Sequence, residues 1–491
     1  MAKGRGLVGL VTATALAGCS FAPAYHPPLT TTPVAFKEAG PWTPASPADL
    51  VPRGGWWALY GDPTLNTLEQ RIDTDNPTLA GALGRYDEAA AYLAEARSGL
   101  FPHIGLDADV TRNRQSDNRP LRGANQPNHY PADTIDGDVG YELDLWGRVR
   151  NSVAAGKAEA QASKDDLAAI KLSLEAELAN SYLTLRGYDE QLVLLTATVD
   201  AYAKADGVTQ RRFAGGIASG LDTGRSGAQL AEAQAQISDV QAARALTEHA
   251  IASLVGTPAS LFSLPVAQIA FAMPSIPLGL PSTLLQRRPD VAAAERRMSA
   301  ANSEIGVAKA AFYPSISLGG QGGFQNTGLP SLFTAPNIFW SIGPSAVLSL
   351  FDGGRRRAQL AVARASWTQA TADYRTDVLQ AFKEVEDNLA QLHYLGDEAA
   401  SEQRAAQQAG QTEALSLNRY VKGAANYLDV VTAQTTALRV RRTAIDLKTR
   451  RLQASVRLIR ALGGGWQNVT QRDASAGEAS PAAIIPPAPK S

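Results

Sequence analysis

The sequence contains the stretch Ile135-Asp136-Gly137-Asp138-Val139-Gly140-Tyr141-Glu142-Leu143-Asp144-Leu145-Trp146-Gly147-Arg148. As far as Leu145, its odd-numbered residues are mainly apolar and its even-numbered residues mainly acidic. Successive side chains of a β-strand point to opposite faces, so this alternation predicts a strand with one apolar and one polar face. The segments after Pro102 and around Ile342 alternate in the same way. Each predicted strand has about ten residues, the length of a tilted membrane strand.

Strands of this kind allow two interpretations. In an ordinary sheet, the chain's own helices cover the apolar face, whereas in a membrane β-barrel the apolar face is turned to lipid and the polar face to a lumen. Two hairpins give four strands, which are too few to close a barrel. An open edge in lipid leaves unpaired backbone groups that each cost several kcal/mol. If the strands lie in a membrane, the chain must therefore oligomerise, and three copies supply twelve strands.

The polar face of the first hairpin is strongly acidic. In the barrel interpretation it lines the lumen and predicts a preference for small cations. The residues of this predicted lumen face are Asp107, Asp109, Asp136, Asp138, Glu142 and Asp144.

An internal repeat relates the two halves of the chain. At a shift of 207 residues the matching pairs include Leu143 and Leu350, Gly147 and Gly354, Arg212 and Arg419, Phe213 and Tyr420, and Asp222 and Asp429. Further upstream the shift becomes 212, which places Pro77 on Pro289 and Pro102 on Pro314. The difference requires an insertion in the first half, and the polar stretch from Thr111 to Thr134 is the predicted loop that holds it.

Each half is predicted to contain a helix, a β-hairpin, a long helix, a turn and another helix. The first helix of each half begins at Pro77 or Pro289, where proline is tolerated. The long helices begin at Gly147 and Gly354 and run for some 60 residues, roughly 90 Å, which requires coiled-coil-like neighbours. Breaks are expected at Gly215-Gly216 and at Gly423, and the last helices run to Leu254 and Leu462.

The single cysteine lies at the end of a predicted secretory signal. Lys3 and Arg5 precede a short apolar core, which ends in Leu16-Ala17-Gly18-Cys19. This pattern resembles a bacterial lipobox, so Cys19 is the predicted lipidation site, and acyl chains on it would anchor the protein stably. The alternative is an ordinary signal peptide with a chance cysteine. The following stretch to Pro63 is rich in proline and predicts an extended strap without helix.

Composition excludes several function classes. Lys+Arg is 46 and Asp+Glu is 47, so the chain lacks the basic excess of a general nucleic-acid binder. One cysteine excludes a disulfide framework, and no paired histidine motif, nucleophile elbow, P-loop or dinucleotide fingerprint is present in the sequence. Beyond the N-terminus, no apolar run approaches the roughly 20 residues of a membrane-spanning helix. We therefore expect no enzymatic activity and no cofactor or metal.

Three motifs resemble a known family. They are Leu285-Gln286-Arg287-Arg288-Pro289-Asp290-Val291-Ala292-Ala293-Ala294-Glu295, Ala310-Ala311-Phe312-Tyr313-Pro314-Ser315-Ile316 and Leu350-Phe351-Asp352-Gly353-Gly354-Arg355. Together they resemble the TolC-like outer membrane efflux factors, in the lipoprotein branch often labelled NodT. The resemblance implies an α+β membrane protein with a two-fold internal repeat of helix, β-hairpin, long helix and helix. It also implies a homotrimer whose 12-stranded β-barrel is continued by a periplasmic α-helical barrel.

The resemblance implies a function as well. Such a protein is the passive outer membrane channel of a tripartite efflux pump. Its partners are a periplasmic adaptor, an inner-membrane RND-type transporter that loads drugs or small toxic compounds, and outer membrane lipid. The predicted domains are a signal peptide at 1–18, a lipid-anchored strap at 19–63, a first repeat at 64–256 with its hairpin at about 103–145, an equatorial linker at 257–280, a second repeat at 281–463 with its hairpin at about 315–351, and a disordered tail at 464–491.

In the family, side chains near the turn after each long helix close the periplasmic end. Family members usually carry an acidic residue where Thr432 stands and often Arg where Thr435 stands, so the usual aspartate ring does not transfer directly. The gate candidates in this sequence are Leu428, Asp429, Asp222, Arg225 and Thr432. The alternative for Asp222 and Asp429 is that they are N-caps of the following helices, and the two roles are compatible.

Two other functions share part of this pattern. A conduit for type I protein secretion has the same architecture and differs in its partner. A periplasmic coiled-coil scaffold lipoprotein has the anchor and the helices but does not need alternating strands.

Overall fold

The computed structural model describes residues 20–28, 33, 35–38, 55–120, 123, 125–274, 276 and 287–464. The chain divides into two compact units. Unit 1 takes its residues from Met1–Thr30, Leu83–Asp165 and Ala293–Thr376, and unit 2 from Thr31–Ala82, Asp166–Ala292 and Asp377–Ser491. The predicted tail lies outside the described residues, apart from Gly464, as does Cys19.

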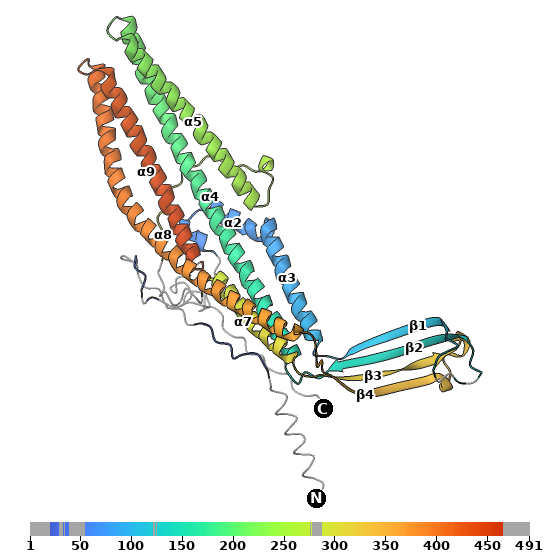
Figure 1. Cartoon of the computed structure of the whole chain (residues 1–491). Coiled ribbons are helices and arrows are strands. Elements are labelled where there is room, and N and C mark those ends of the chain that lie inside the picture. Colours follow the sequence, from blue (N-terminus) through green and yellow to red (C-terminus); the bar gives the residue numbers. More distant parts are fainter. Residues whose placement is uncertain are drawn as a thin grey trace, which may run out of the picture. The chain divides into compact units, whose positions relative to one another are not determined.

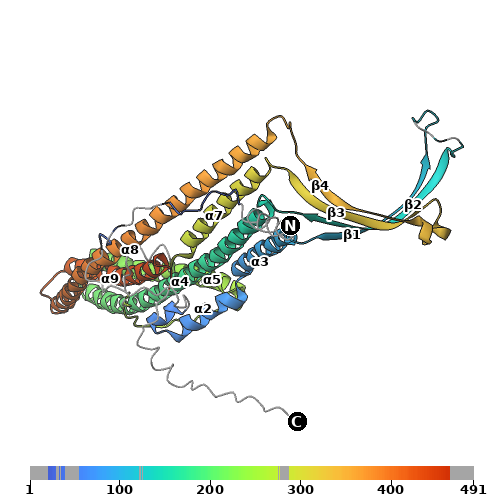
Figure 2. The ribbon, with the colours of Figure 1, turned by 90° about the horizontal axis from the view of Figure 1, so that it is seen from below.

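Unit 1 contains one antiparallel sheet with the strand order β1-β2-β3-β4 (Figure 1). Its strands are β1 (His103–Arg114), β2 (His129–Glu142), β3 (Ser315–Asn326) and β4 (Ile338–Val347). The register places Asp107 opposite Asp136, and Asp136 opposite Gly323. Figure 2 shows that the strands curve along their length. Within this sheet β1 and β4 each have a strand neighbour on one side only.

The two faces of the sheet differ as the alternation predicts. Directly opposed residues share a face, so one face carries rows such as Ile104, Val139 and Ile342. These apolar side chains are not covered: Ile104 is 78% exposed, Trp340 75% and Ile342 70%. The hypothesis that the chain's own helices cover the apolar face is therefore wrong for the described residues.

The first hairpin is longer than expected. The polar composition predicts a loop from Thr111 to Thr134, but the ladder continues to the pair Arg114 and His129. Ladder hydrogen bonds join backbone groups, so polar side chains do not end a strand when the partner backbone stays in reach. Strand β1 therefore ends at Arg114, and strand β2 begins at His129.

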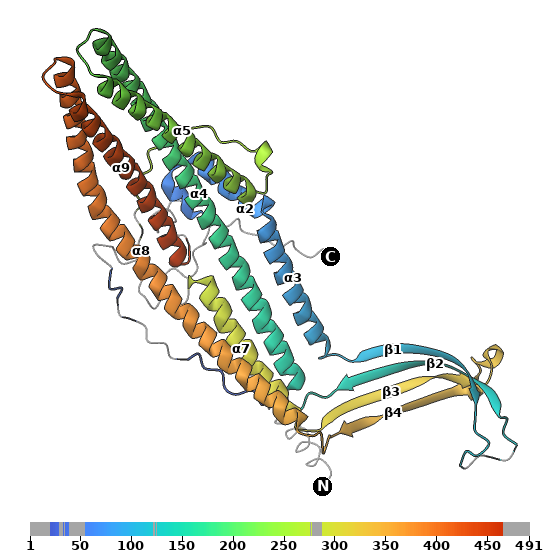
Figure 3. The ribbon, with the colours of Figure 1, turned by 45° about the horizontal axis from the view of Figure 1, so that its top comes forward.

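The long helices follow the predicted plan closely. They are α3 (Pro77–Ser98), α4 (Arg148–Ala214), α5 (Gly220–Leu254), α7 (Pro289–Ala310), α8 (Arg355–Val421) and α9 (Tyr427–Ala461). Both bounds of α8 and of α9 lie 207 residues after those of α4 and α5, and both bounds of α7 and β3 lie 212 residues after those of α3 and β1. In unit 2, α4 and α5 run side by side, as do α8 and α9 (Figure 1, Figure 3).

One close helix contact in unit 2 relies on glycine, because a Cβ on Gly187 of α4 would lie only 2.5 Å from the Thr449 hydroxyl of α9. In unit 1, α3 and α4 are close enough that a Cβ on Gly156 of α4 would make an ordinary van der Waals contact, 3.6 Å, with the Cα of Leu93 in α3. Leu178 and Leu185 of α4 are fully buried. Among the described residues, no helix has both the length and the apolar character required to cross a membrane.

The proline-rich strap contains a helical turn that we did not expect. Trp56–Tyr60 forms a 3₁₀ helix, η1, in unit 2, and Pro63 is the first residue of α2 (Pro63–Asp75). The Asp62 side chain caps α2, and proline fits this first position because its missing N–H would have no helical partner. Tertiary contacts hold η1: the Trp56 indole donates to Glu175, and the Tyr60 hydroxyl lies 2.6 Å from that of Ser455.

The chain immediately after Cys19 is fixed to unit 1. The Ser20 hydroxyl donates to Asn151 over 2.9 Å. The Phe21 ring stacks on Tyr313 with centroids 4.5 Å apart, and Tyr313 stacks in turn on Trp146. Residues 20 and 21 therefore lie against the junctions where β2 meets α4 and α7 meets β3.

Unit 2 buries two neighbouring carboxyl groups. Glu69 of α2 and Glu175 of α4 are 1% and 3% exposed, and neither Glu69 oxygen has a partner in the described chain. Burial, reinforced by Glu175 and Asp73, raises the pKa of Glu69 to about 10. Burial also raises the pKa of Glu175 to about 7, although the Trp56 indole and Lys171 oppose that rise.

These two groups make unit 2 sensitive to pH. A carboxyl whose pKa is higher in the folded than in the unfolded state stabilises the fold at low pH, and this stability is lost as pH rises through the folded value. Between about pH 5 and about pH 8 we therefore expect amide-exchange protection of residues 56–75 to fall, after correction for intrinsic exchange. Glu175→Gln should flatten this dependence, whereas Glu398→Gln, at an exposed site of α8, should not. An unchanged slope in Glu175→Gln would show that Glu175 does not titrate here.

Candidate functional site

Two short turns end the paired helices of unit 2. After α4, the Ile217 amide bonds the Arg212 carbonyl, and after α8 the Ala424 amide bonds the Arg419 carbonyl. Both turns place a glycine in the left-handed region, Gly216 at φ 72° and Gly423 at φ 79°. This is the Schellman arrangement, in which glycine avoids the Cβ clash that other residues meet. The helices therefore end where the glycines predict.

The following helices begin almost at once, and their caps correct the sequence prediction. The N-cap residues are Ser219 and Asn426, not Asp222 and Asp429. The Ser219 hydroxyl accepts from the Asp222 amide, and the Asp222 carboxylate in turn accepts from the Ser219 amide, which is a capping box. Asp429 occupies the same third position of α9. Both aspartates thus stand in the first helical turn, where a negative charge is favourable.

One arginine ties the two turns together. Arg212, near the end of α4, donates to the Tyr420 carbonyl of α8 over 2.6 Å, and its guanidinium lies 4.7 Å from the centre of the Tyr420 ring. Tyr420 is buried and meets the Tyr427 ring edge to face at 5.2 Å. The contact combines a charge-assisted hydrogen bond with a cation–π interaction.

A small core surrounds this tie. Tyr420, Tyr427 and Val430 form a buried cluster, and Val208 of α4 packs against it. Burial, aided by Asp206, raises the pKa of Tyr427 to about 12, so the phenol stays neutral. Further along, the buried Gln229 amide of α5 donates to Gln434 of α9. The pairs α4–α5 and α8–α9 are therefore joined along this end of unit 2.

The gate candidates lie on the first two turns of α5 and α9. Leu428 is 47% exposed, and Asp429 and Thr432 beside it are exposed too. The Thr432 hydroxyl is bound to the Leu428 carbonyl. Asp222 and Arg225 are half-buried on α5, and within the described chain no ion pair joins Arg225 to either aspartate. The structure thus groups the candidates into two sets, one on each hairpin.

The predicted acidic face divides as well. Asp107 and Asp109 of β1 are exposed, and Asp136 and Asp138 of β2 are half-buried on the polar face of the sheet. The other two members have separate partners. Glu142 is bound by Arg148, and Asp144 lies beyond β2, where it accepts from the Val149 and Arg150 amides and pairs with the Arg150 side chain. The Asp144 carboxylate therefore caps the start of helix α4 rather than continuing the strand face.

The sequence analysis missed the functional side chains that make these contacts. Arg148 and Arg150 follow their acidic partners by six residues, so a carboxylate shortly before an arginine-rich helix start was an available signal. Asp352, just before α8, pairs in a similar way with Arg356, the second residue of that helix. In the sequence, Arg212 and Tyr420 stand out only as members of repeat pairs. Nothing in the local pattern indicates that they touch.

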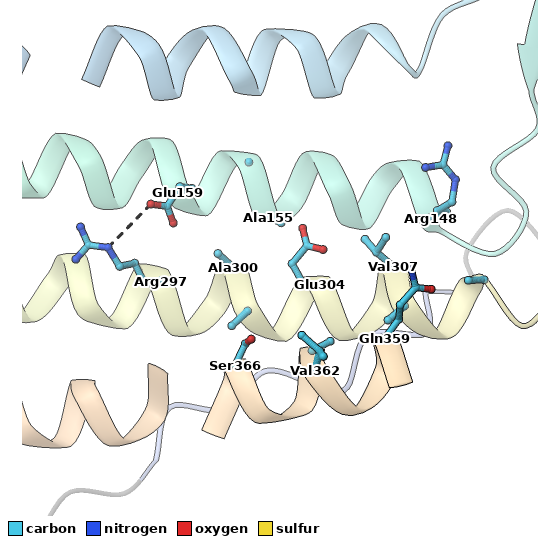
Figure 4. A pocket seen from close by; sticks show the side chains of 15 residues that line it. Arg148, Ala155, Glu159, Arg297, Ala300, Glu304, Val307, Gln359, Val362 and Ser366 are labelled. Atoms are coloured by element: carbon cyan, nitrogen blue, oxygen red, sulfur yellow. Dashed lines mark ion pairs between the residues drawn. The ribbon is translucent and has the colours of Figure 1, made fainter. Parts of the chain in front are cut away.

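Unit 1 also has an open groove of about 730 Å³ between α4, α7 and α8 (Figure 4). Small side chains such as Ala155 and Ala300 form much of its lining, and Arg297 pairs with Glu159 at one end. The Glu304 side chain projects from α7 toward α4. No group of three or more potential metal ligands occurs among the described residues. The charged groups of the groove lining are the carboxylates of Glu159 and Glu304 and the guanidinium groups of Arg148 and Arg297.

Comparisons with known proteins agree with this architecture. The family model "Outer membrane efflux protein" matches residues 68–257 and 280–464. The chain is 31% identical over 464 residues to outer membrane protein OprJ of Pseudomonas aeruginosa, covering 94% of this chain and 96% of OprJ. It is 28% identical to the probable outer membrane lipoprotein SilC of Salmonella typhimurium, covering 94% of this chain and 98% of SilC.

The chain belongs to the outer membrane efflux protein family. The solved outer-membrane channel OprN superimposes on it with a TM-score of 0.81 at 28% identity, covering 92% of this chain and all of OprN. The resemblance drawn from the three sequence motifs is thereby confirmed. The protein is an outer membrane efflux channel, and its relatives are channel proteins rather than enzymes.

The Arg212 tie predicts a measurable weakness at the turns of this efflux protein. Arg212→Ala removes a charge-assisted bond and a cation–π contact, together worth about 2 kcal/mol. We expect amide-exchange protection around residues 206–230 and 415–435 to drop roughly tenfold or more. Arg211→Ala, at the exposed neighbouring position, should leave protection unchanged. Equal protection in the two variants would mean that Arg212 does not hold the turns together.

Proposed function

We propose that this efflux channel is a homotrimer in which three sheets close a 12-stranded β-barrel, continued by a periplasmic barrel of helices. The observation that carries the proposal is the open sheet of unit 1. Its apolar face is bare, and its outer strands β1 and β4 each lack a neighbour in the described chain. In lipid such edges cost several kcal/mol for each unpaired backbone group. Pairing β1 of one copy with β4 of the next removes both edges, and three copies give a closed wall.

The two-fold internal repeat belongs to the same proposal. It is supported by the constant offsets of 207 and 212 residues between corresponding helix and strand bounds. The domain bounds follow the repeat, with repeats at 64–256 and 281–463, a linker at 257–280, a strap at 19–63 after a signal peptide at 1–18, and a tail at 464–491.

The anchor proposed at Cys19 fits the place where the following residues are held. Ser20 and Phe21 lie against Asn151 and Tyr313, at the junctions between strands and helices of unit 1. Acyl chains on Cys19 would therefore enter the membrane near the base of the sheet. The similarity to SilC, a probable outer membrane lipoprotein, supports this assignment.

The lining and the gate take their residues from different units. For the barrel lumen we propose Asp107, Asp109, Asp136 and Asp138, since Glu142 and Asp144 are bound to arginines. For the periplasmic constriction we propose the first two turns of α5 and α9, with Leu428 as the apolar element. Asp429, Asp222, Arg225 and Thr432 are the polar elements.

The channel works as a passive duct in this proposal. A periplasmic adaptor docks at the helical turns, and an inner-membrane transporter of the RND type loads drugs or small toxic compounds. Relatives named as outer membrane proteins of a toluene efflux pump and of an antibiotic efflux pump support such cargo.

Particle mass tests the proposed assembly. The protein mass of the purified particle, corrected for bound detergent by light scattering, should be about three times that of one processed copy of the 51.8 kDa chain. Deletion of the gene should raise intracellular dye, and a plasmid copy should restore export. A stable soluble monomer would contradict the trimer, and unchanged dye levels would contradict the pump assignment.

Ion selectivity tests the proposed lining. Under a salt gradient in planar bilayers we expect the channel to prefer small cations, because carboxylates face the lumen. Replacing Asp107, Asp109, Asp136 and Asp138 by asparagine should shift the reversal potential toward the value of a non-selective channel. Asp397→Asn, an exposed site on α8 of unit 2, serves as the control. Anion preference in the unmodified channel would overturn the lumen assignment.

A further inference from the structure

The end of unit 2 buries one set of residues and exposes the set that corresponds to it. Val208, Arg212 and Tyr420 meet inside the chain. Adding 207 to the first two gives Leu415 and Arg419, and subtracting 207 from the third gives Phe213. These counterparts are open: Leu415 is 64% exposed, Phe213 is 49% exposed and Arg419 is exposed. The chain therefore exposes one half of an equivalent contact on α8, at Leu415 and Arg419, and the other half on α4, at Phe213.

The counterpart residues keep the chemistry of the buried contact. Arg419 is again an arginine near the end of a long helix, and Phe213 offers the same kind of ring face as Tyr420. Among the described residues, the Arg419 side chain donates only within its own turn, through a 3.3 Å bond to the Ala424 carbonyl. Exposed Ile217 and Leu221 extend the apolar surface beside Phe213. An arginine and an aromatic ring are thus both available for a partner.

We infer that Arg419 and Leu415 of one copy pack against Phe213 of a second copy, forming between subunits the same contact that Arg212 and Val208 make with Tyr420 within a chain. We refer to this as the intersubunit seam. The inference rests on the proposed trimer and adds the residues that join neighbouring copies at the turn end.

Symmetry selects a second copy as the occupant. If α4–α5 and α8–α9 alternate around a ring, every α4–α5 pair has an α8–α9 pair on both sides. One of these neighbours belongs to the same chain and the other to the next chain. The repeat operation that carries α4 onto α8 then carries α8 onto α4 of the next copy, so the Arg212–Tyr420 contact becomes Arg419–Phe213. A contact of this kind repeats head to tail and closes with the ring.

The intersubunit seam and the corresponding Arg212–Tyr420 contact within the chain, the intrachain seam, differ in strength for a chemical reason. Tyr420 has a hydroxyl 3.3 Å from that of Thr209, whereas Phe213 has none. The intrachain seam also gains the buried Tyr427 ring, whose counterpart is Gly220. The intersubunit seam therefore has fewer polar contacts and less buried aromatic surface. It is the weaker of the two and the one expected to separate first.

Cysteine pairs distinguish the seams. The full-length channel carrying Phe213→Cys and Arg419→Cys is purified in detergent and treated with a short bis-maleimide. We expect dimer and trimer bands on a denaturing gel, because each link joins two copies. Arg212→Cys with Tyr420→Cys should give only a monomer band of shifted mobility. Both Phe213 and Arg419 are exposed, so their replacement leaves the buried core intact.

Matched controls show whether a link between copies is specific to Phe213 and Arg419. Phe213→Cys alone and Arg419→Cys alone report any linkage through Cys19 and should remain monomeric on the gel. Phe213→Cys with Arg404→Cys should not link, since Arg404 lies about 22 Å along α8 from Arg419. A particle of trimeric mass without intersubunit bands, or with a shifted monomer only, would overturn the intersubunit seam but leave the proposed function standing. A monomeric particle would instead contradict the proposed trimer itself.

Discussion

The unsatisfied backbone of the sheet edges is the constraint on which the remaining structure depends. A four-stranded sheet with a bare apolar face is stable neither in water nor in lipid as a single copy, because β1 and β4 keep unpaired groups and side chains such as Ile104 and Trp340 stay exposed. The chain belongs to the outer membrane efflux protein family, so the environment of this surface is that of an outer membrane protein. In the proposed trimer the apolar face lies against lipid, and each sheet edge pairs with the edge of a neighbouring copy.

The long helices are subject to a different requirement, because a helix of this length needs other helices packed along it. Helices of 67 residues hold together only if neighbours accompany them, and the chain supplies these with α5 and α9. Small residues permit the approach, most clearly at Gly187, where a side chain would collide with Thr449. The tie between Arg212 and Tyr420 joins the two helix pairs of one chain, and the corresponding surfaces at Phe213 and Arg419 remain open.

Much of this was predictable because it is local. The alternation around Val139 specifies the faces of the strand, and proline at 77 and 289 and glycine at 216 and 423 specify where helices begin and end. What failed depends on partners distant in sequence. Strand β2 extends into a polar stretch because the backbone of β1 lies beside it and pairs with it. Asp144 forms an ion pair with Arg150 instead of continuing the strand face. The helix η1 forms because the Trp56 indole donates a hydrogen bond to Glu175. The Arg212–Tyr420 contact spans 208 residues, and no periodicity encodes it.

The connections between the paired helices have a mechanical consequence. Only residues 215–219 and 422–426 separate one helix from the next, and nearly all of that length is occupied by the glycine turn and the capping residue. Such short connections have almost no residues that could change conformation independently of the helices. If this end of the protein widens or narrows, the displacement must pass into whole helices, which would swing as stiff levers several nanometres long, and not into rearranging loops.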